Sequence, residues 1–376
     1  MSQFVQLYRK DLNDREVLKL VKKPSVVSID TKSGSLAYNR LDMQASQALH
    51  MAIELFPNLN YLLVLDHYDD ITIFDDDNSP ETVSYYQMKT NEESISINTA
   101  ISEKWLEKLY KQLERPDWIV KELGLITNCP LKMTVVFKDD EDKLHKKETN
   151  YTAEYTPFSS FNPQIIEKIK KDIAKSQGIA PSDVDLSKFV HMRTTLSIPK
   201  HREIVEQEMG DFLHKQYPRI TLDSIKTIFA SMMDLLVKKQ GYELLATDAS
   251  FVEVKKHKGV SKSDLSRIID DAIALSLPPF DEIERLLNFA NDAEKNYASY
   301  QYTVIFSDIQ KKNTAFDIVF RQVRELFSNN HQNNEESVSE YCNRIYTLMP
   351  AKYLIYDKTY ILVLITSMII NEWRRQ

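Results

Sequence analysis

Glycine is scarce in this sequence, with six residues among 376. Neither a G-x-x-x-x-G-K-[S/T] pattern nor a G-x-G-x-x-G pattern is present. Loops that cradle phosphate groups need these glycines, because a backbone without side chains can approach the phosphate closely. We therefore do not expect this chain to form such a nucleotide-binding loop.

Cysteine is scarcer still, since only Cys129 and Cys342 occur and they form no C-x-x-C pair. This argues against a disulfide framework and agrees with a reducing cytoplasm. The eight histidines show no H-E-x-x-H or H-x-x-x-H spacing, and no G-x-S-x-G motif is present. Neither a zinc enzyme nor a serine hydrolase is therefore expected.

The sequence also lacks long apolar stretches. Its first residues contain no apolar segment typical of a signal peptide. The longest apolar run, Ile361–Ile370, is interrupted by Thr366 and Ser367 and is too short to span a bilayer. We expect a cytoplasmic protein that makes no contact with a membrane.

An excess of positive charge is absent too, because the formal net charge is −7. A protein that coats nucleic acid by itself neutralises phosphates with Lys and Arg, so this balance counts against such a role. A local basic groove, or a partner that delivers the nucleic acid, would reconcile the net charge with nucleic-acid binding.

The first half of the chain alternates helix and strand patterns. Apolar residues recur at helical spacing from Arg40 to Phe56, and Pro57 ends the pattern. A second helix is predicted near residues 101–113. Strands are predicted at residues 61–65, 71–74, 82–90, 124–127 and 131–137.

The second half reads as mainly helical. Residues 139–149 form a highly charged segment, which predicts a solvated loop. Asn162 and Pro163 then provide an N-cap and a first helical residue for a helix that ends at Gly178. Ser261 or Ser263 marks the start of one later helix. Further helices are predicted near residues 201–216, 222–240, 261–275, 280–295, 313–329, 335–348 and 358–374.

The length of the chain is sufficient for two domains. We predict an α/β domain over residues 1–155, in which residues 1–30 form an N-terminal arm. A mainly α-helical domain is predicted over residues 156–376.

Polar residues end the third predicted strand. Alternate strand residues share a face, so Gln87 and Lys89 point the same way as Tyr85. Asp70 begins the preceding strand, next to Asp69, and we expect it to lie close to Gln87 and Lys89 if the two strands pair. Carboxylate and carbonyl oxygens are the ligands that Mg²⁺ prefers, and a neighbouring lysine can orient water and stabilise negative charge.

This arrangement resembles the PD-(D/E)xK nuclease fold, the restriction-endonuclease-like α/β core, in its D…QxK variant. It is most similar to the double-stranded DNA nuclease domain of bacterial anti-phage effectors, which occurs in CBASS operons and beside HerA-type ATPases. The resemblance covers residues 34–135, with a fainter continuation at residues 212–218 and 261–269. It rests on the segments GSLAYNRLDMQASQAL (34–49), LDHYDDITI (65–73), YYQMKT (85–90) and GLITNCPL (124–131).

The resemblance implies a catalytic site formed by Asp70, Gln87 and Lys89 with Mg²⁺ or Mn²⁺. Asp70 would bind the metal, and Lys89 would orient the attacking water. The carbonyl of Met88 and a residue of the preceding helix, either Glu54 or Gln44, would complete the metal ligands, with Glu54 preferred. Asp69 could exchange roles with Asp70. The resemblance further implies double-stranded DNA as substrate, a homo-oligomer, and a HerA-type ATPase or another defence-system partner that controls activity through the helical half.

Three features leave alternatives open. The lysines at 143, 146 and 147 either line a DNA groove or form a solvated face. The apolar C-terminal helix near 358–374 is either the centre of a core or an interface with another chain. The whole chain could also be a non-catalytic scaffold that keeps the nuclease fold and recruits a motor or nucleic acid, or a ribonuclease on the same fold.

Overall fold

The computed structural model describes residues 33–115, 117–138, 143–218, 220–311, 313–333 and 335–375. The predicted N-terminal arm, residues 1–30, lies outside the described residues. No helix in the described part of the chain is both long enough and apolar enough to cross a membrane.

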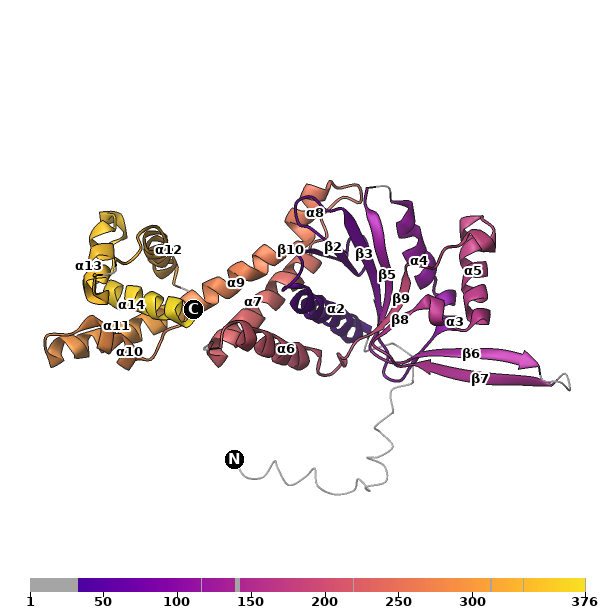
Figure 1. Cartoon of the computed structure of the whole chain (residues 1–376), viewed down its shortest axis with the longest axis horizontal. Coiled ribbons are helices and arrows are strands. Elements are labelled where there is room, and N and C mark those ends of the chain that lie inside the picture. The colour runs from indigo at the N-terminus through magenta and orange to yellow at the C-terminus, as the bar shows by residue number, and fades with distance from the viewer. Residues whose placement is uncertain are drawn as a thin grey trace, which may run out of the picture. The chain divides into compact units, whose positions relative to one another are not determined.

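A mixed sheet forms the centre of the α/β core (Figure 1). Within the described residues it has seven strands in the order β10-β1-β2-β3-β5-β9-β8. Strands β1, β2 and β3 form an antiparallel meander, whereas β3, β5 and β9 run parallel to one another. The strands are β1 (Leu62–Leu65), β2 (Ile71–Phe74), β3 (Thr82–Lys89), β5 (Ile119–Thr127), β8 (Tyr155–Pro157), β9 (Phe189–Arg193) and β10 (Gly259–Ser261).

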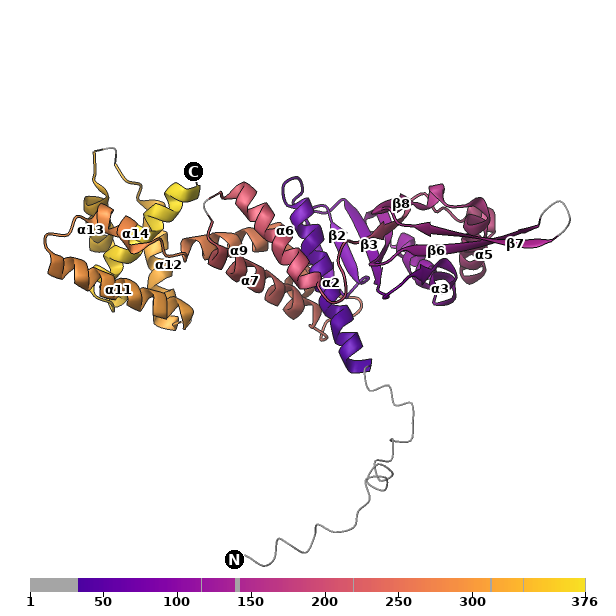
Figure 2. The same cartoon turned by 90° about the horizontal axis from the view of Figure 1, so that it is seen from below.

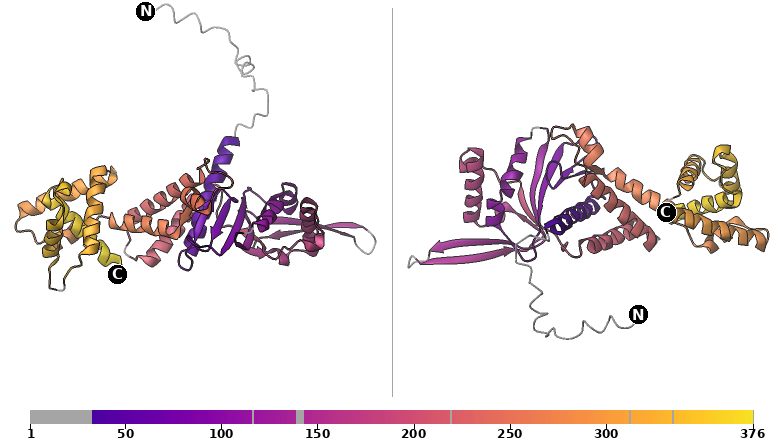
Figure 3. Two further views of the ribbon diagram at one scale, coloured as in Figure 1. Left: turned by 90° about the horizontal axis from the view of Figure 1, so that it is seen from above. Right: turned by 180° about the vertical axis from the view of Figure 1, so that it is seen from behind.

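Helices cover both faces of this sheet, as Figures 1 and 3 show from opposite sides. Alternate residues of β3 serve different cores: Tyr86 and Met88 pack with α2, α6, α7 and α9, whereas Val83 and Tyr85 pack with α3, α4, α5 and α8. The helices are α2 (Ser33–Leu55), α3 (Ile97–Ser102), α4 (Trp105–Lys111), α5 (Pro163–Gln177), α6 (His201–Gln216), α7 (Leu222–Gln240), α8 (Phe251–Lys258) and α9 (Lys262–Ala274).

A second, three-stranded sheet is formed by one short strand that precedes β5 in the chain and two longer strands that follow it. Its strands β4 (Ile95–Ser96), β6 (Leu131–Lys138) and β7 (Leu144–Tyr151) pair in the order β4-β6-β7, and β6 and β7 run side by side as a hairpin (Figure 2). Residues 144–149 were predicted as part of a solvated loop, and this prediction is wrong. Strand β7 is exposed over nearly its whole length, so it lacks the apolar alternation by which a strand is recognised.

The remaining helices enclose a third hydrophobic core of their own. Most of α14 is buried there, including Tyr360, Ile361 and Ile365, so α14 is a central core helix of this group rather than a free apolar face. The helices are α10 (Phe280–Leu287), α11 (Asp292–Gln310), α12 (Thr314–Asn329), α13 (Val338–Leu348) and α14 (Lys358–Arg375).

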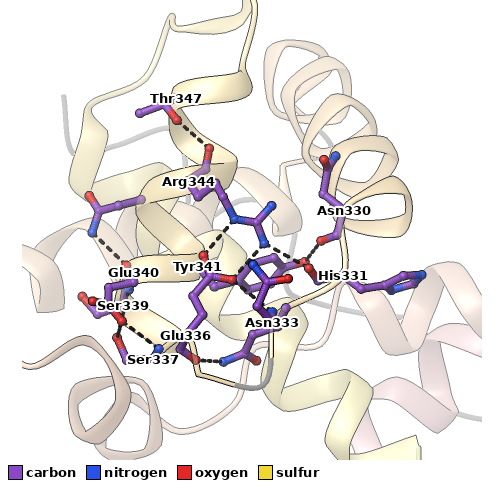
Figure 4. Close-up of polar contacts among 12 residues, drawn as sticks. Asn330, His331, Asn333, Glu336, Ser337, Ser339, Glu340, Tyr341, Arg344 and Thr347 are labelled. Atoms are coloured by element: carbon purple, nitrogen blue, oxygen red, sulfur yellow. Dashed lines mark hydrogen bonds and ion pairs between the residues drawn. The ribbon is translucent and has the colours of Figure 1, made fainter.

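Arg344 makes several of the polar contacts that hold the connection between α12 and α13 (Figure 4). Arg344 donates two hydrogen bonds to the carboxylate of Glu336, at 2.8 and 2.9 Å, and one to the carbonyl of His331 at 3.0 Å. Its guanidinium also lies 5.1 Å from the ring centroid of Tyr341. A bidentate pair of this kind holds both partners in one geometry and lowers the pKa of Glu336.

The predicted α/β core followed by a large helical part is confirmed, but some elements differ. The helix predicted near 101–113 is interrupted at Lys104, whose φ of 59° lies in the left-handed region. The helix predicted at 280–295 is in fact two helices. The first ends at its C-cap Asn288, whose φ is 50°, and the second begins after its N-cap Asn291. Strands β9 and β10 belong to the main sheet although they follow residue 155. The predicted division at residues 155 and 156 stays a prediction.

Candidate active site

Asp70 lies at the point where the turn after β1 enters β2. Its backbone carbonyl accepts a hydrogen bond from the Asp66 N–H at 3.3 Å, and its own N–H donates to Asp69 Oδ1 at 3.0 Å. Because β2 and β3 are antiparallel and Ile71 is opposite Tyr86, Asp70 is placed beside the end of β3. The N–H of Met88 donates to Asp70 Oδ2 at 2.7 Å, which fixes the carboxylate against the strand.

Lys89 ends β3 and turns its ammonium toward the same carboxylate. Lys89 Nζ lies 3.4 Å from Asp70 Oδ2, and the two side chains are 24% and 21% exposed. The indole ring of Trp105 on α4 lies beneath the ammonium, with its centroid 5.4 Å from Nζ. The pair is therefore oriented by its surroundings and still accessible to water and to a substrate.

Gln87 projects from the same face of β3 as Lys89. Its side chain is 5% exposed, yet its Oε1 has no hydrogen-bond partner among the described residues. A buried amide oxygen without a partner is costly, so such an atom calls for an explanation. A ligand or a cation that accepts this oxygen would provide one.

Asp69 is held deeper in the same site. Gln112 donates from Nε2 to the carbonyl of Tyr68 at 2.7 Å and to Asp69 Oδ2 at 3.4 Å. Burial raises the pKa of Asp69 to about 6, and the neighbouring carboxylate of Asp70 contributes in the same direction. Gln112 therefore ties the turn that carries both aspartates to the end of α4.

A cavity of about 570 Å³ opens beside these residues. It is lined by α4 and the segment that follows it on one side, and by Asp69 and Gln87 on the other. Its remaining lining residues are Tyr68, Lys108, Lys111, Gln112, Glu114, Arg115 and Asp117.

The structure does not bring Glu54 to this site. Glu54 is 63% exposed and pairs with His50 at 3.7 Å on α2. Helix α2 packs on the face of the sheet that carries Tyr86 and Met88, whereas Gln87 and Lys89 project from the other face. Gln44, the other candidate on α2, accepts a hydrogen bond from Gln240 at 3.0 Å.

Metal ligation at this site would depend on few carboxylates. Within the described residues, no group of three His, Cys, Asp or Glu side chains could hold an ion. The available donors are the carboxylate of Asp70, the amide oxygen of Gln87 and the carbonyl of Met88. Since the N–H and C=O of a strand residue point to the same side, the Met88 carbonyl lies on the side of Asp70. Such an oxygen set suits Mg²⁺ or Mn²⁺, which retain several waters.

The predicted DNA-binding lysines lie on the β6–β7 hairpin. Lys143 precedes β7, and Lys146 and Lys147 are exposed within it. The hairpin leaves the main sheet just after Thr127, which is opposite Lys89 in the β3–β5 pair. The lysines therefore follow the end of the sheet that bears the site, but the adjoining segment 139–142 is Asp-Asp-Glu-Asp, which offsets their charge.

Sequence reasoning missed the contribution of α4. Trp105 and Gln112 contact the site, and no sequence motif predicts these contacts. One signal was present: Lys104, Lys108 and Lys111 are spaced four and three residues apart, which places them on one side of a helix.

The chain is similar to proteins that are already known. Residues 32–240 match the family model described as the Cap4 dsDNA endonuclease domain. The chain is also 30% identical over 254 residues to the Lamassu protein LmuA of Bacillus cereus (strain VD014), across 66% of this chain and 67% of that protein.

Two solved structures of Cap4 SAVED/CARF-domain containing receptors are more distant. The receptor of Moraxella osloensis is 13% identical with a TM-score of 0.36, and that of Acinetobacter baumannii, bound to the cyclic trinucleotide 2'3'3'-cAAA, is 11% identical with a TM-score of 0.34. These matches cover 62% and 61% of this chain but 47% and 44% of the receptors. The chain therefore spans less than half the length of the two receptors.

Proposed function

Because this chain belongs to the family of Cap4 dsDNA endonuclease domains, we propose that it is a metal-dependent endonuclease of an anti-phage defence system. It cuts double-stranded DNA and has a PD-(D/E)xK core. The observation that carries the proposal is the 3.4 Å contact between Lys89 Nζ and Asp70 Oδ2 at a solvent-accessible sheet end. Little sequence preference is expected, since no element for reading base edges was found in the sequence.

Asp70, Gln87 and the Met88 carbonyl would hold the metal ion. The unpartnered, buried Oε1 of Gln87 supports this assignment, because a cation would satisfy it. A bound Mg²⁺ or Mn²⁺ polarises a phosphate and lowers the pKa of coordinated water. Glu54 does not contribute to the proposed metal site, because α2 packs on the other face of the sheet.

Lys89 would orient the attacking water and stabilise the charge that develops on the phosphate. Its side chain is 24% exposed and its ammonium is held between Asp70 and Trp105, so little reorganisation is needed for this role. Lys143, Lys146 and Lys147 stay proposed DNA contacts on the hairpin.

Uncontrolled cutting would damage the host, so we propose that activity depends on assembly. The candidates are a homo-oligomer and a complex with a HerA-type ATPase or another defence-system partner. Helices α10–α14 have a hydrophobic core of their own, and we assign such contacts to the exposed surface of this helical part.

The test compares duplex plasmid and a matched RNA, each with Mg²⁺, Mn²⁺ or EDTA, for wild type and Asp70→Asn. The proposal predicts cutting of plasmid with metal, no cutting in EDTA, and a loss of about 100-fold or more in Asp70→Asn. Cutting of RNA alone, or cutting by Asp70→Asn at the wild-type rate, would contradict it.

A non-catalytic scaffold is the second candidate, and the neutral side chain of Gln87 favours it. An amide is a weaker metal ligand than the carboxylate found at this position in many related nucleases. Thermal unfolding with increasing Mn²⁺ separates the two candidates. A nuclease should be stabilised by the metal less in Asp70→Asn than in wild type, whereas a scaffold should respond equally in both.

A further inference from the structure

Helix α4 covers the site and contacts two of its parts. Trp105, its first residue, lies beneath the ammonium of Lys89. Gln112, just after its last residue, holds Asp69 and the carbonyl of Tyr68. The position of α4 is therefore coupled to the geometry of the site.

The same segment carries a basic stripe, which we define as Lys104, Lys108, Lys111 and Arg115. Lys108 and Lys111 are three residues apart on one side of α4, whereas Lys104 precedes the helix and Arg115 follows it. Three members, Lys108, Lys111 and Arg115, line the cavity that Gln87 also lines. The sequence shows the stripe, but only the structure places it beside the site.

The members of the stripe differ in how far they are already paired. Lys111 lies 3.0 Å from Glu107, and Arg115 donates to Gln112 at 2.8 Å and stacks on the ring of Tyr68. Lys108 is exposed, and no ion pair is found for it among the described residues. Lys108 is therefore the cation of the cavity that is most available to an external anion.

The charges of the cavity indicate what kind of anion it suits. Asp69, Glu114 and Asp117 line it together with the three cations, so a small free anion gains little there. A nucleic-acid strand is different, because several phosphates reach the cations while one phosphate lies at the metal site. Gln87, whose unpartnered Oε1 is a proposed metal ligand, lines the same cavity, so these cations lie next to the proposed metal site.

We propose that Lys108 and Lys111 bind the phosphate backbone of the DNA strand that is cut, next to the scissile phosphate, so that α4 positions the duplex. This inference rests on the proposed function. The proposed DNA contact surface lies on α4, which packs on the main sheet. It is separate from the lysines of the β6–β7 hairpin.

The test is the affinity for a fluorescent duplex, measured by anisotropy over a range of salt concentrations. All proteins carry Lys89→Ala so that the probe stays intact. Lys108→Glu is compared with Lys175→Glu, a matched control, because Lys175 is also exposed and helical, on α5, with no ion pair found among the described residues. Lys111→Ala is the second variant, and thermal unfolding verifies that each protein is folded.

We expect Lys108→Glu to weaken duplex binding by about five-fold or more and to reduce the slope of log K against log salt by about 1 to 2. Lys111→Ala should weaken binding in the same direction, and Lys175→Glu should stay within about two-fold of its parent. Equal affinities for Lys108→Glu and Lys175→Glu would overturn the inference. If the Lys89→Ala parent cuts plasmid as fast as wild type, the proposed catalytic site is wrong. The role of the stripe in DNA binding is then still supported if Lys108→Glu weakens duplex binding in this parent.

Discussion

At the scale of single residues, Gly124 shows how closely β3 and β5 pack. It is opposite Tyr86 in the parallel pair, and a Cβ atom at Gly124 would lie 2.3 Å from Tyr86 Cδ1. The ring of Tyr86 is buried, and its hydroxyl donates to Glu122 at 2.8 Å. The ring therefore has little freedom to move away.

Gly124→Ala should lower the free energy of unfolding by about 1–3 kcal/mol, because the Tyr86 ring must shift. Gly210→Ala is the control: the nearest atom is 3.8 Å from its Cβ, and alanine in a helix is favoured over glycine by about 0.5–1 kcal/mol. Urea denaturation measures both. A Gly124→Ala protein as stable as wild type would contradict the close packing.

His191 on β9 is a buried histidine that must stay neutral. Thr127 Oγ1 donates to the carbonyl of Cys129 at 2.7 Å, so it accepts from His191 Nε2 at 2.8 Å. This leaves Nδ1 unprotonated and without a partner among the described residues. Burial lowers the pKa of His191 to about 4.

The unfolded chain should therefore bind more protons at His191 than the folded chain between pH 6.5 and about pH 4. The contribution of His191 to the free energy of unfolding therefore rises with pH across this window and is lost as the pH falls through it. At pH 5 the loss from this residue alone amounts to about 2 kcal/mol. Urea denaturation at pH 7 and pH 5 should show a smaller difference for His191→Gln than for wild type, and the same difference in both proteins would contradict this account.

Asp70, Gln87 and Lys89 could be selected from the sequence because strand alternation and hairpin order bring them to one sheet end. Glu54 could not be placed, since the sequence does not reveal which face of the sheet α2 covers. Trp105 and Gln112 act through contacts between segments that are distant in the sequence. The apolar periodicity of the sequence does not predict such contacts.

At the scale of elements, Ser261 joins a strand to a helix without a loop. It is the last residue of β10, paired with Leu62, and the N-cap of α9. Its hydroxyl accepts from the N–H of Asp264 and donates to the carboxylate of the same residue, at 3.1 and 2.8 Å. Of the two serines that the sequence left open, the structure selects Ser261.

Ser261→Ala should destabilise the fold by about 1–2 kcal/mol, because two N-terminal contacts of α9 are lost at a buried position. Ser263→Ala, an exposed position in the first turn, is the control and should change stability by about 0.5 kcal/mol or less. Thermal unfolding of both proteins measures the difference. Equal midpoints would show that the capping box contributes little.

Elements with a clear apolar period were predictable, and elements shaped by distant partners were not. The helix at 201–216 and the strand at 71–74 have the predicted bounds. Strand β7 is polar and depends on pairing with β6, and β10 has only three residues. The break at Lys104 needs a left-handed backbone, which a lysine does not signal in sequence.

At the scale of the whole molecule, three hydrophobic cores organise the described residues: one on each face of the main sheet and one among α10–α14. The net charge of −7 is compatible with DNA binding if the cations are local, as in the stripe on α4 and its two flanking residues. The composition could not show this, because the stripe becomes a surface only when α4 packs beside β3.

The central claim is that Asp70 and Lys89 together act on a phosphodiester. The most direct measurement is the initial rate at which the Lys89→Ala protein cuts supercoiled plasmid in Mn²⁺. It is made under conditions in which wild type cuts the plasmid, and Lys175→Ala is the control. The account predicts a loss of about 100-fold or more for Lys89→Ala and an unchanged rate for Lys175→Ala. A folded Lys89→Ala protein that cuts at the wild-type rate would contradict it.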